Sequence, residues 1–125
     1  MVSLFLVMLG GALGAGGRYF AGRVAIALGG GGYPWGTLFV NVTGALAMGL
    51  LVGGLARAAV PQENARLLLG VGVLGGFTTF SAFALDIVVM VDRGAWGVAL
   101  GYALASVIGS VLALFCGLAI VRGLA

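Results

Sequence analysis

The chain has 125 residues, of which 62% are hydrophobic and only 7% are charged. A water-soluble domain carries about 25% charged residues, so this composition excludes a soluble globular fold and indicates an integral membrane protein. The six arginines are scattered singly and do not form the basic patch of a nucleic-acid-binding protein. With three carboxylates, one cysteine and no histidine, we expect no disulfide, no zinc or haem site, and no enzyme activity.

Four apolar runs are each long enough to cross a bilayer, which takes about 20 residues. They lie at about residues 2–28, 35–55, 65–91 and 95–121. The first run has no charged segment before it, so we expect a retained helix and not a signal peptide. The sequence therefore predicts an all-α, multi-pass membrane protein with one four-span domain.

The second run contains one strongly polar side chain, Asn41, which shares a helix face with Thr37. Two interpretations stay open for Asn41. Its amide could join two helices by hydrogen bonds, or it could line a polar pathway through the membrane.

The third run is interrupted near its middle by the stretch Gly75 to Phe83, which mixes glycines, hydroxyls and aromatic rings. A polar patch at this depth is costly unless it lines a cavity or holds an ion. The glycines and threonines weaken the helix, so we expect a break whose freed carbonyls could coordinate a small cation. Phe77 is expected in core or lipid packing, whereas Phe80 or Phe83 should border the polar patch and present electropositive ring edges to an anion.

The fourth run places Tyr102, Ser106 and Ser110 at i, i+4 and i+8, on one helix face. Single serines in membrane helices usually bond back to their own helix. Three hydroxyls in file favour a solvated or ion-conducting track, because they donate hydrogen bonds without carrying a fixed charge.

Glycines at small-xxx-small spacing occur in the first run, at Gly10 and Gly14, and in the third run, at Gly72 and Gly76. Such faces let helices approach closely in lipid. A four-helix monomer offers little interior for so many small faces, so we expect an oligomer.

The arginines divide evenly between the two sides of the membrane. Arg57, Arg66 and Arg122 fall on one side, and Arg18, Arg23 and Arg93 fall on the other, with Arg18 and Arg23 expected to snorkel to the interface. Without a bias the positive-inside rule selects neither orientation, so we hypothesise an antiparallel dimer of inverted copies.

Three segments together, residues 10–19, 36–44 and 75–81, resemble the Fluc (CrcB) family of fluoride channels. The resemblance covers the whole chain in order. It implies a dual-topology antiparallel homodimer with two narrow fluoride pores, a structural sodium ion at the dimer centre, and passive loss of cytoplasmic fluoride that lowers its toxicity. The partners it implies are a second copy of the chain, fluoride and membrane lipid, with no nucleic acid.

The resemblance also implies roles for individual residues. The pore lining would comprise Asn41, Thr79, Phe80, Ser81 and Phe83, with Tyr102, Ser106 and Ser110 as the polar track. Backbone carbonyls of Gly75 and Thr78 would hold the sodium ion, and Arg18 would lie near a pore entrance. The family commonly has a hydroxyl where this chain has Ala82.

Two other functions remain as alternatives. A proton-coupled small multidrug exporter needs a carboxylate within the membrane, and the only candidate is Asp86, for which an ion pair with an arginine is the plainer role. A purely structural membrane subunit would use the glycine packing equally well but would leave the polar file without a purpose.

Overall fold

The structure, a computed structural model, describes residues 1–123. Its helices are α1 (Val2–Gly29), α2 (Trp35–Ala56), α3 (Glu63–Ala65), η1 (Arg66–Leu74), α4 (Gly75–Phe77), α5 (Ser81–Asp92) and α6 (Trp96–Gly123). No β-strand occurs in this part of the chain. Four segments are long and apolar enough to cross a membrane, namely α1, α2, the stretch Glu63–Asp92 and α6. The prediction of an all-helical protein with four spans is confirmed.

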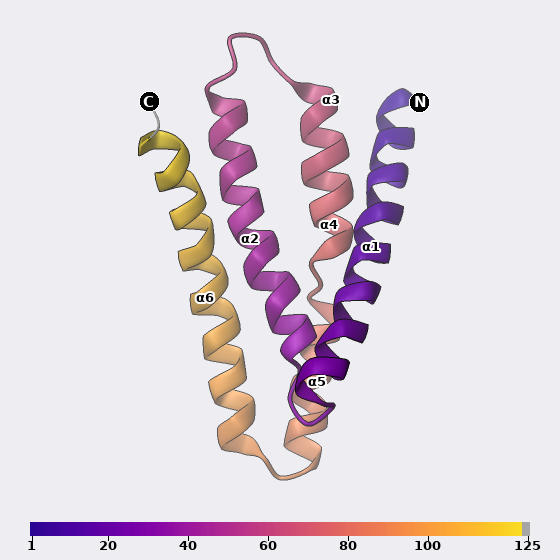
Figure 1. The fold of residues 1–125 in the computed structure, drawn as a ribbon, viewed down its shortest axis with the longest axis vertical. Helices are drawn as coiled ribbons and strands as arrows, with labels where there is room; N and C mark the ends of the chain where they lie inside the picture. The colour runs from indigo at the N-terminus through magenta and orange to yellow at the C-terminus, as the bar shows by residue number, and fades with distance from the viewer. Residues whose placement is uncertain (124–125) are drawn as a thin grey trace.

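The four spans run alternately in opposite directions, so that the connections between them alternate between the two ends of the molecule (Figure 1). The start of α1, the α2–α3 loop and the end of α6 lie at one end, and the α1–α2 loop and the α5–α6 turn lie at the other. Short turns follow α1 and α5, where Gly30 and Gly94 each adopt φ of 77°. Only glycine adopts this left-handed conformation at little cost, which explains the glycine at both turns.

The third span is composed of α3, η1, α4 and α5 and differs from the three continuous helices around it. The segment η1 is a π-helix, in which the Gly75 N–H donates to the Gly70 carbonyl five residues earlier. Residues 78–80 are not helical, and Thr78 is extended, with φ −82° and ψ 159°. This interruption, residues 78–80, is called the break below.

Glycine faces bring the helices together on the side of the break that includes η1 and α4. The helix α1 packs along η1 and α4, and α2 packs along α6. A Cβ atom on Gly72 would come within 2.8 Å of the Gly10 Cα, and one on Gly76 would come within 2.6 Å of the Gly11 carbonyl oxygen. The small-xxx-small faces of the first and third runs are therefore in contact within a single chain, and they do not by themselves require an oligomer.

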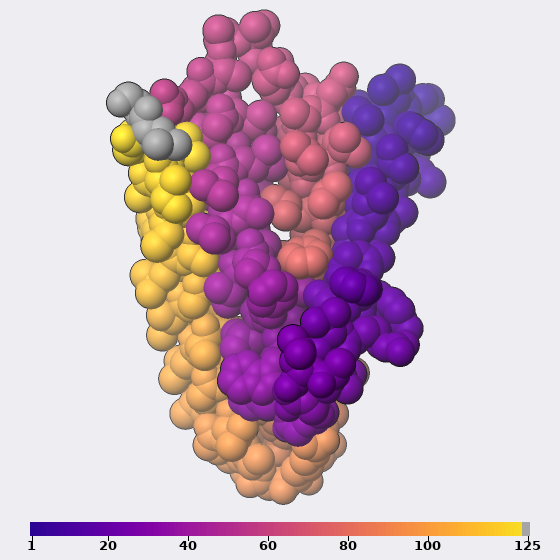
Figure 2. All heavy atoms as spheres, viewed as in Figure 1, coloured from indigo at the N-terminus to yellow at the C-terminus, as the bar shows by residue number. Residues whose placement is uncertain are grey.

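Aromatic side chains form the core on the other side of the break. Phe83, Met90, Ala99 and Tyr102 are buried together between α5 and α6. The ring centroid of Tyr102 lies 5.2 Å from that of Phe83 and 5.6 Å from that of Tyr33, the latter in an edge-on arrangement. Figure 2 shows gaps between α2 and the glycine-rich part of the third span, whereas the atoms are closely packed toward the α5–α6 turn.

Candidate functional site

The break ends one helical segment and begins another within the membrane, and its own residues cap both ends. The N–H and the hydroxyl of Thr78 both donate to the Leu74 carbonyl, at 3.0 and 2.9 Å. The Thr79 hydroxyl accepts from the Ala82 N–H at 3.2 Å, which satisfies a free donor in the first turn of α5. Ala82 therefore takes part in the cap through its backbone N–H, although its side chain has no hydroxyl to offer.

Asn41 on α2 binds the middle of the break with both groups of its amide. Its Nδ2 donates to the Thr79 carbonyl at 2.9 Å, and its Oδ1 accepts from the Thr79 N–H at 2.8 Å. A backbone amide at this depth has no water to bond, so the paired hydrogen bonds replace those that the helix has lost. The structure therefore gives Asn41 the helix-joining contact, and the second Nδ2 hydrogen remains free for another acceptor.

Arg18 on α1 binds the end of α4. Its Nε donates to the Gly76 carbonyl at 3.1 Å, and the side chain is partly buried. This carbonyl lies in the last turn of a helical segment, where a positive charge is favourable. Arg18 is held at the level of the break, so the expectation that it snorkels to the membrane interface is wrong. Arg23, one turn further along α1, is exposed and donates to the Tyr19 hydroxyl.

The carbonyls of Gly75, Phe77 and Thr78, at or just before the break, accept no hydrogen bond among residues 1–123. Of these residues, Gly75 and Thr78 line a groove that opens at the break. Unpaired carbonyl oxygens are the ligands that hard cations prefer, so these two groups fit a small cation. One chain provides only two such oxygens there.

The groove has a volume of about 440 Å³ and is lined by segments of α2, the break, α5 and α6. Its lining residues are Asn41, Gly75, Thr78, Thr79, Phe80, Phe83, Ser106, Val107, Ser110 and Val111. None of these side chains is ionisable. The Ser106 hydroxyl is buried and has no hydrogen-bond partner within the described chain, and a buried polar group without a partner normally has a ligand or water. The rings of Phe80 and Phe83 are neighbours, with centroids 5.5 Å apart.

Tyr102 lies apart from this groove. It is completely buried, and its hydroxyl donates to Asp86 Oδ2 at 2.9 Å. The only ion pair in residues 1–123 joins Glu63 to Arg66 at the exposed start of the third span. The expectation that Asp86 pairs with an arginine is therefore wrong, because no arginine among residues 1–123 lies within ion-pair distance of it and its partner is the Tyr102 hydroxyl.

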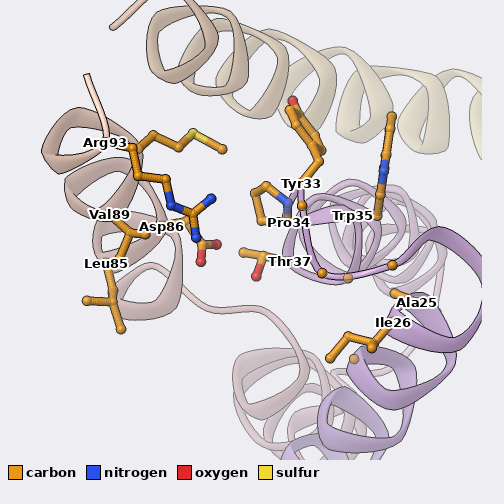
Figure 3. Close-up of a pocket in the computed structure, with 16 residues that line it drawn as sticks. Ala25, Ile26, Tyr33, Pro34, Trp35, Thr37, Leu85, Asp86, Val89 and Arg93 are labelled. Carbon is orange, nitrogen blue, oxygen red and sulfur yellow. The ribbon is translucent and has the colours of Figure 1, made fainter. Parts of the chain in front are cut away.

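A second cavity, of about 300 Å³, lies between the glycine-rich α1–α2 loop and α5. Figure 3 shows Asp86 and Arg93 reaching into it from α5, with Thr37 facing them from α2 and Tyr33 at its edge. This cavity lies near the end of the molecule that holds the short turns, whereas the groove lies at the break.

The structure thus brings most of the predicted site residues together, but not all of them. Asn41, Thr79, Phe80, Phe83, Ser106 and Ser110 meet in one groove. Ser81 lies beside it, with its hydroxyl 3.5 Å from that of Thr79, and Arg18 lies on the α1 side of the break. Sequence reasoning missed the Arg18–Gly76 bond, although an arginine far from either end of an apolar run was a signal that it needed a partner inside the membrane.

Comparison with known proteins gives a consistent result. A model of the CrcB-like protein family, Camphor Resistance (CrcB), matches residues 5–118. Proteins named fluoride-specific ion channel FluC are similar over the full length. The one from Chelativorans sp. (strain BNC1) is 56% identical, with 99% of each chain covered. The one from Novosphingobium aromaticivorans is 51% identical, with 100% of each chain covered. The one from Caulobacter sp. (strain K31) is 53% identical, with 98% of this chain and 96% of that protein covered.

Proposed function

This chain belongs to the CrcB family, and from that membership we propose that it is a fluoride-specific ion channel. The relatives are ion channels by name, and ion channels are not enzymes, so the expectation of no enzyme activity is confirmed. The family and the four spans together make the chain a multi-pass membrane protein. We further propose that it lies in the inner membrane and lets cytoplasmic fluoride leave passively.

The observation that best supports this function is the uncharged, hydrogen-bond-donating lining of the groove at the break. Fluoride is small and strongly hydrated, so a pore must replace its water with donors at little cost of reorganisation. The hydroxyls of Thr79, Ser106 and Ser110 and the free Asn41 N–H are such donors. A lysine here would bind the anion too tightly to release it, and the groove has none.

The unpartnered Ser106 hydroxyl is the most specific element of this proposal. It is buried at the wall of the groove and bonds to nothing within the described chain, so an anion in the groove would compete with no internal acceptor for this donor. Phe80 and Phe83 add ring edges, whose hydrogens carry partial positive charge, on the α5 wall of the groove. Ser81 lies beside the groove and Tyr102 lies apart from it, so a direct contact of either with the ion stays a prediction.

A second, inverted copy of the chain completes the proposed pore. The groove opens on the surface of the single chain, and Phe80 is 78% exposed there. Polar groups at this depth need protein or water over them, since lipid offers no hydrogen bonds. With Arg18 at the break, the two ends of the molecule carry three and two arginines, namely Arg57, Arg66 and Arg122 against Arg23 and Arg93. Such a small bias is compatible with insertion in both directions.

We propose that a sodium ion is held where the two copies meet, by the carbonyls of Gly75 and Thr78 from each. Two oxygens from one chain are too few for a hard cation, since calcium, for comparison, takes six to eight oxygens. Four carbonyls from two chains come closer to that number. The ion would supply a fixed positive charge at the dimer centre.

The multidrug-exporter alternative loses its only carboxylate in this arrangement. Asp86 is bonded to the fully buried Tyr102 and does not line the groove. A carboxylate engaged in this way is poorly placed to exchange a proton for a cationic drug.

The deciding experiment measures ion efflux from liposomes that contain the purified protein. Fluoride should leave rapidly while chloride stays, and equal efflux of the two ions would contradict the proposal. Replacing sodium by a large organic cation during purification should weaken the dimer and lower fluoride efflux. If both are unaffected, the sodium site is wrong. Adding two lysines to the Arg57–Arg66 loop should fix one orientation and abolish efflux when that variant is expressed alone.

A further inference from the structure

The carbonyl groups of residues 75–79 fall into two classes. Those of Gly76 and Thr79 each accept a hydrogen bond from a side chain on a different helix. Those of Gly75, Phe77 and Thr78 accept none within residues 1–123. The bonded and unbonded carbonyls are thus interleaved along a short length of backbone.

Arg18 and Asn41 are the two side chains that create this division. Arg18 reaches from α1 and Asn41 from α2, so the break is held from two sides by helices that are themselves continuous. Neither contact is local in sequence, with 58 residues separating Arg18 from Gly76 and 38 separating Asn41 from Thr79. A charged donor on a carbonyl gives a strong hydrogen bond, and the paired Asn41 bonds hold both peptide units that flank the Thr79 Cα.

We infer that Arg18 and Asn41 are positioning residues that hold the break and occupy the carbonyls of Gly76 and Thr79, which leaves the carbonyls of Gly75 and Thr78 on the groove open to a cation. The role of these two open carbonyls rests on the proposed function, whereas the holding of the break does not. This assignment differs from a role for Arg18 as an attractor of anions, because the atom that makes its contact is Nε and the partner is the backbone.

Two substitutions of Arg18 can distinguish the effect of its hydrogen-bond donor from the effect of its positive charge. In glutamine, Nε2 stands at the same number of bonds from Cα as the arginine Nε, and it also donates a hydrogen bond. In methionine a methyl group stands at that position. Arg18→Gln and Arg18→Met therefore both remove the charge, but only Arg18→Gln keeps the donor.

The first test is amide hydrogen exchange in the peptide that covers residues 75–83 of the purified full-length protein. We expect Arg18→Met to accelerate exchange there about tenfold, the effect of losing one hydrogen bond to a charged group. Arg18→Gln should stay within about threefold of the unmodified chain, because its donor can still reach the Gly76 carbonyl. Arg23→Met removes a charge from the same helix without touching the break, and it should leave exchange unchanged.

Asn41 is tested in the same way with Asn41→Leu, which keeps the size of the side chain but loses both hydrogen bonds. Exchange in residues 75–83 should again rise about tenfold. The control is Thr43→Val on the same helix, since Thr43 bonds only to the Phe39 carbonyl of its own helix. Asn41→Leu that exchanges no faster than Thr43→Val would overturn the role of Asn41.

The comparison of the two Arg18 variants decides the role of Arg18 whatever their stability. Folding of Arg18→Gln together with failure to fold of Arg18→Met would support it, because both variants lack the charge and only the glutamine amide supplies a donor. Equal behaviour of the two, whether both resemble the unmodified chain or both are damaged, would overturn it.

The second test measures the sodium concentration that gives half of the maximal thermal stabilisation. We expect this concentration to rise about tenfold in Arg18→Met, because a break that is no longer held through the Gly76 carbonyl would position the Gly75 and Thr78 carbonyls less well. Arg18→Gln and Arg23→Met should not raise it. If the unmodified chain shows no sodium dependence, the sodium part of the proposed function fails, and the exchange comparison still decides whether Arg18 and Asn41 hold the break.

Discussion

The two sides of the break are built in different ways. On the side of η1 and α4, α1 and the third span approach each other backbone to backbone at Gly10, Gly14, Gly72 and Gly76. On the side of α5, they touch through buried rings around Tyr102. Backbone contacts have no side chains that could adjust, so that half is sensitive to every added atom, whereas the aromatic half depends on the shape and polar partners of a few large groups. The break lies where the two modes of packing meet.

The largest effect should come from filling a glycine contact. In Gly14→Val the new Cβ would meet the Val73 carbonyl oxygen and lie within 2.8 Å of the Phe77 N–H nitrogen. Neither backbone can move without separating α1 from the third span, so we expect a loss of about 3 kcal/mol or failure to fold. Thermal melts and the yield of monodisperse protein measure this. Gly16→Val, in open space on the same helix, is the control, and equal damage in both would show that the contact is unimportant.

A smaller effect is expected in the aromatic half from Tyr102→Phe. The ring is retained, but the half-buried carboxylate of Asp86 loses the donor that Tyr102 supplies. Leaving a half-buried acceptor unpaired costs about 1 kcal/mol, which a thermal or denaturant melt would detect. Tyr19→Phe removes an exposed hydroxyl that bonds to Arg23 and should change little. Matching stabilities for the two variants would argue that the Asp86 contact does not support the core.

Phe80 and Phe83 lie at or next to the break, and substituting each of them distinguishes an effect on stability from an effect on fluoride conduction. Phe83 is only 7% exposed in the chain, so Phe83→Ile should lower its stability by about 1 kcal/mol, whereas Phe80→Ile, at a position 78% exposed, should not. Fluoride efflux from liposomes should fall in both variants, because each loses ring edges in the groove. Full efflux in both would remove the role proposed for the rings.

The smallest effect is expected far from the break. Glu63→Gln disrupts the ion pair with Arg66, whose members are both exposed at the start of the third span. Exposed pairs contribute little, so we expect no measurable change in the melting temperature or in efflux. A clear loss of stability would mean that the comparison between the two halves omits an important contact at the membrane surface.

The sequence predicted the four spans because they depend on local composition. Apolar runs identify the four helices, and glycines beside threonines at mid-membrane depth identify the site where a helix is weakest. The sequence could not show that Gly10 and Gly14 face Gly72 and Gly76 within one chain, because spacing along a helix does not say which helix is the partner. It also could not show where the Arg18 side chain points, since an arginine in a membrane helix can either bind a group inside the protein or extend to the membrane surface.

The π-helix η1 gives the third span a particular sensitivity to chain length. It winds nine residues, Arg66 to Leu74, more loosely than an α-helix before the α4 segment begins. Each residue of an α-helix turns the chain by about 100°, so removing one residue from η1, or adding one, would rotate Gly76 away from α1. Insertions and deletions should therefore be excluded from this segment, while the loop of residues 57–62 should accept them readily.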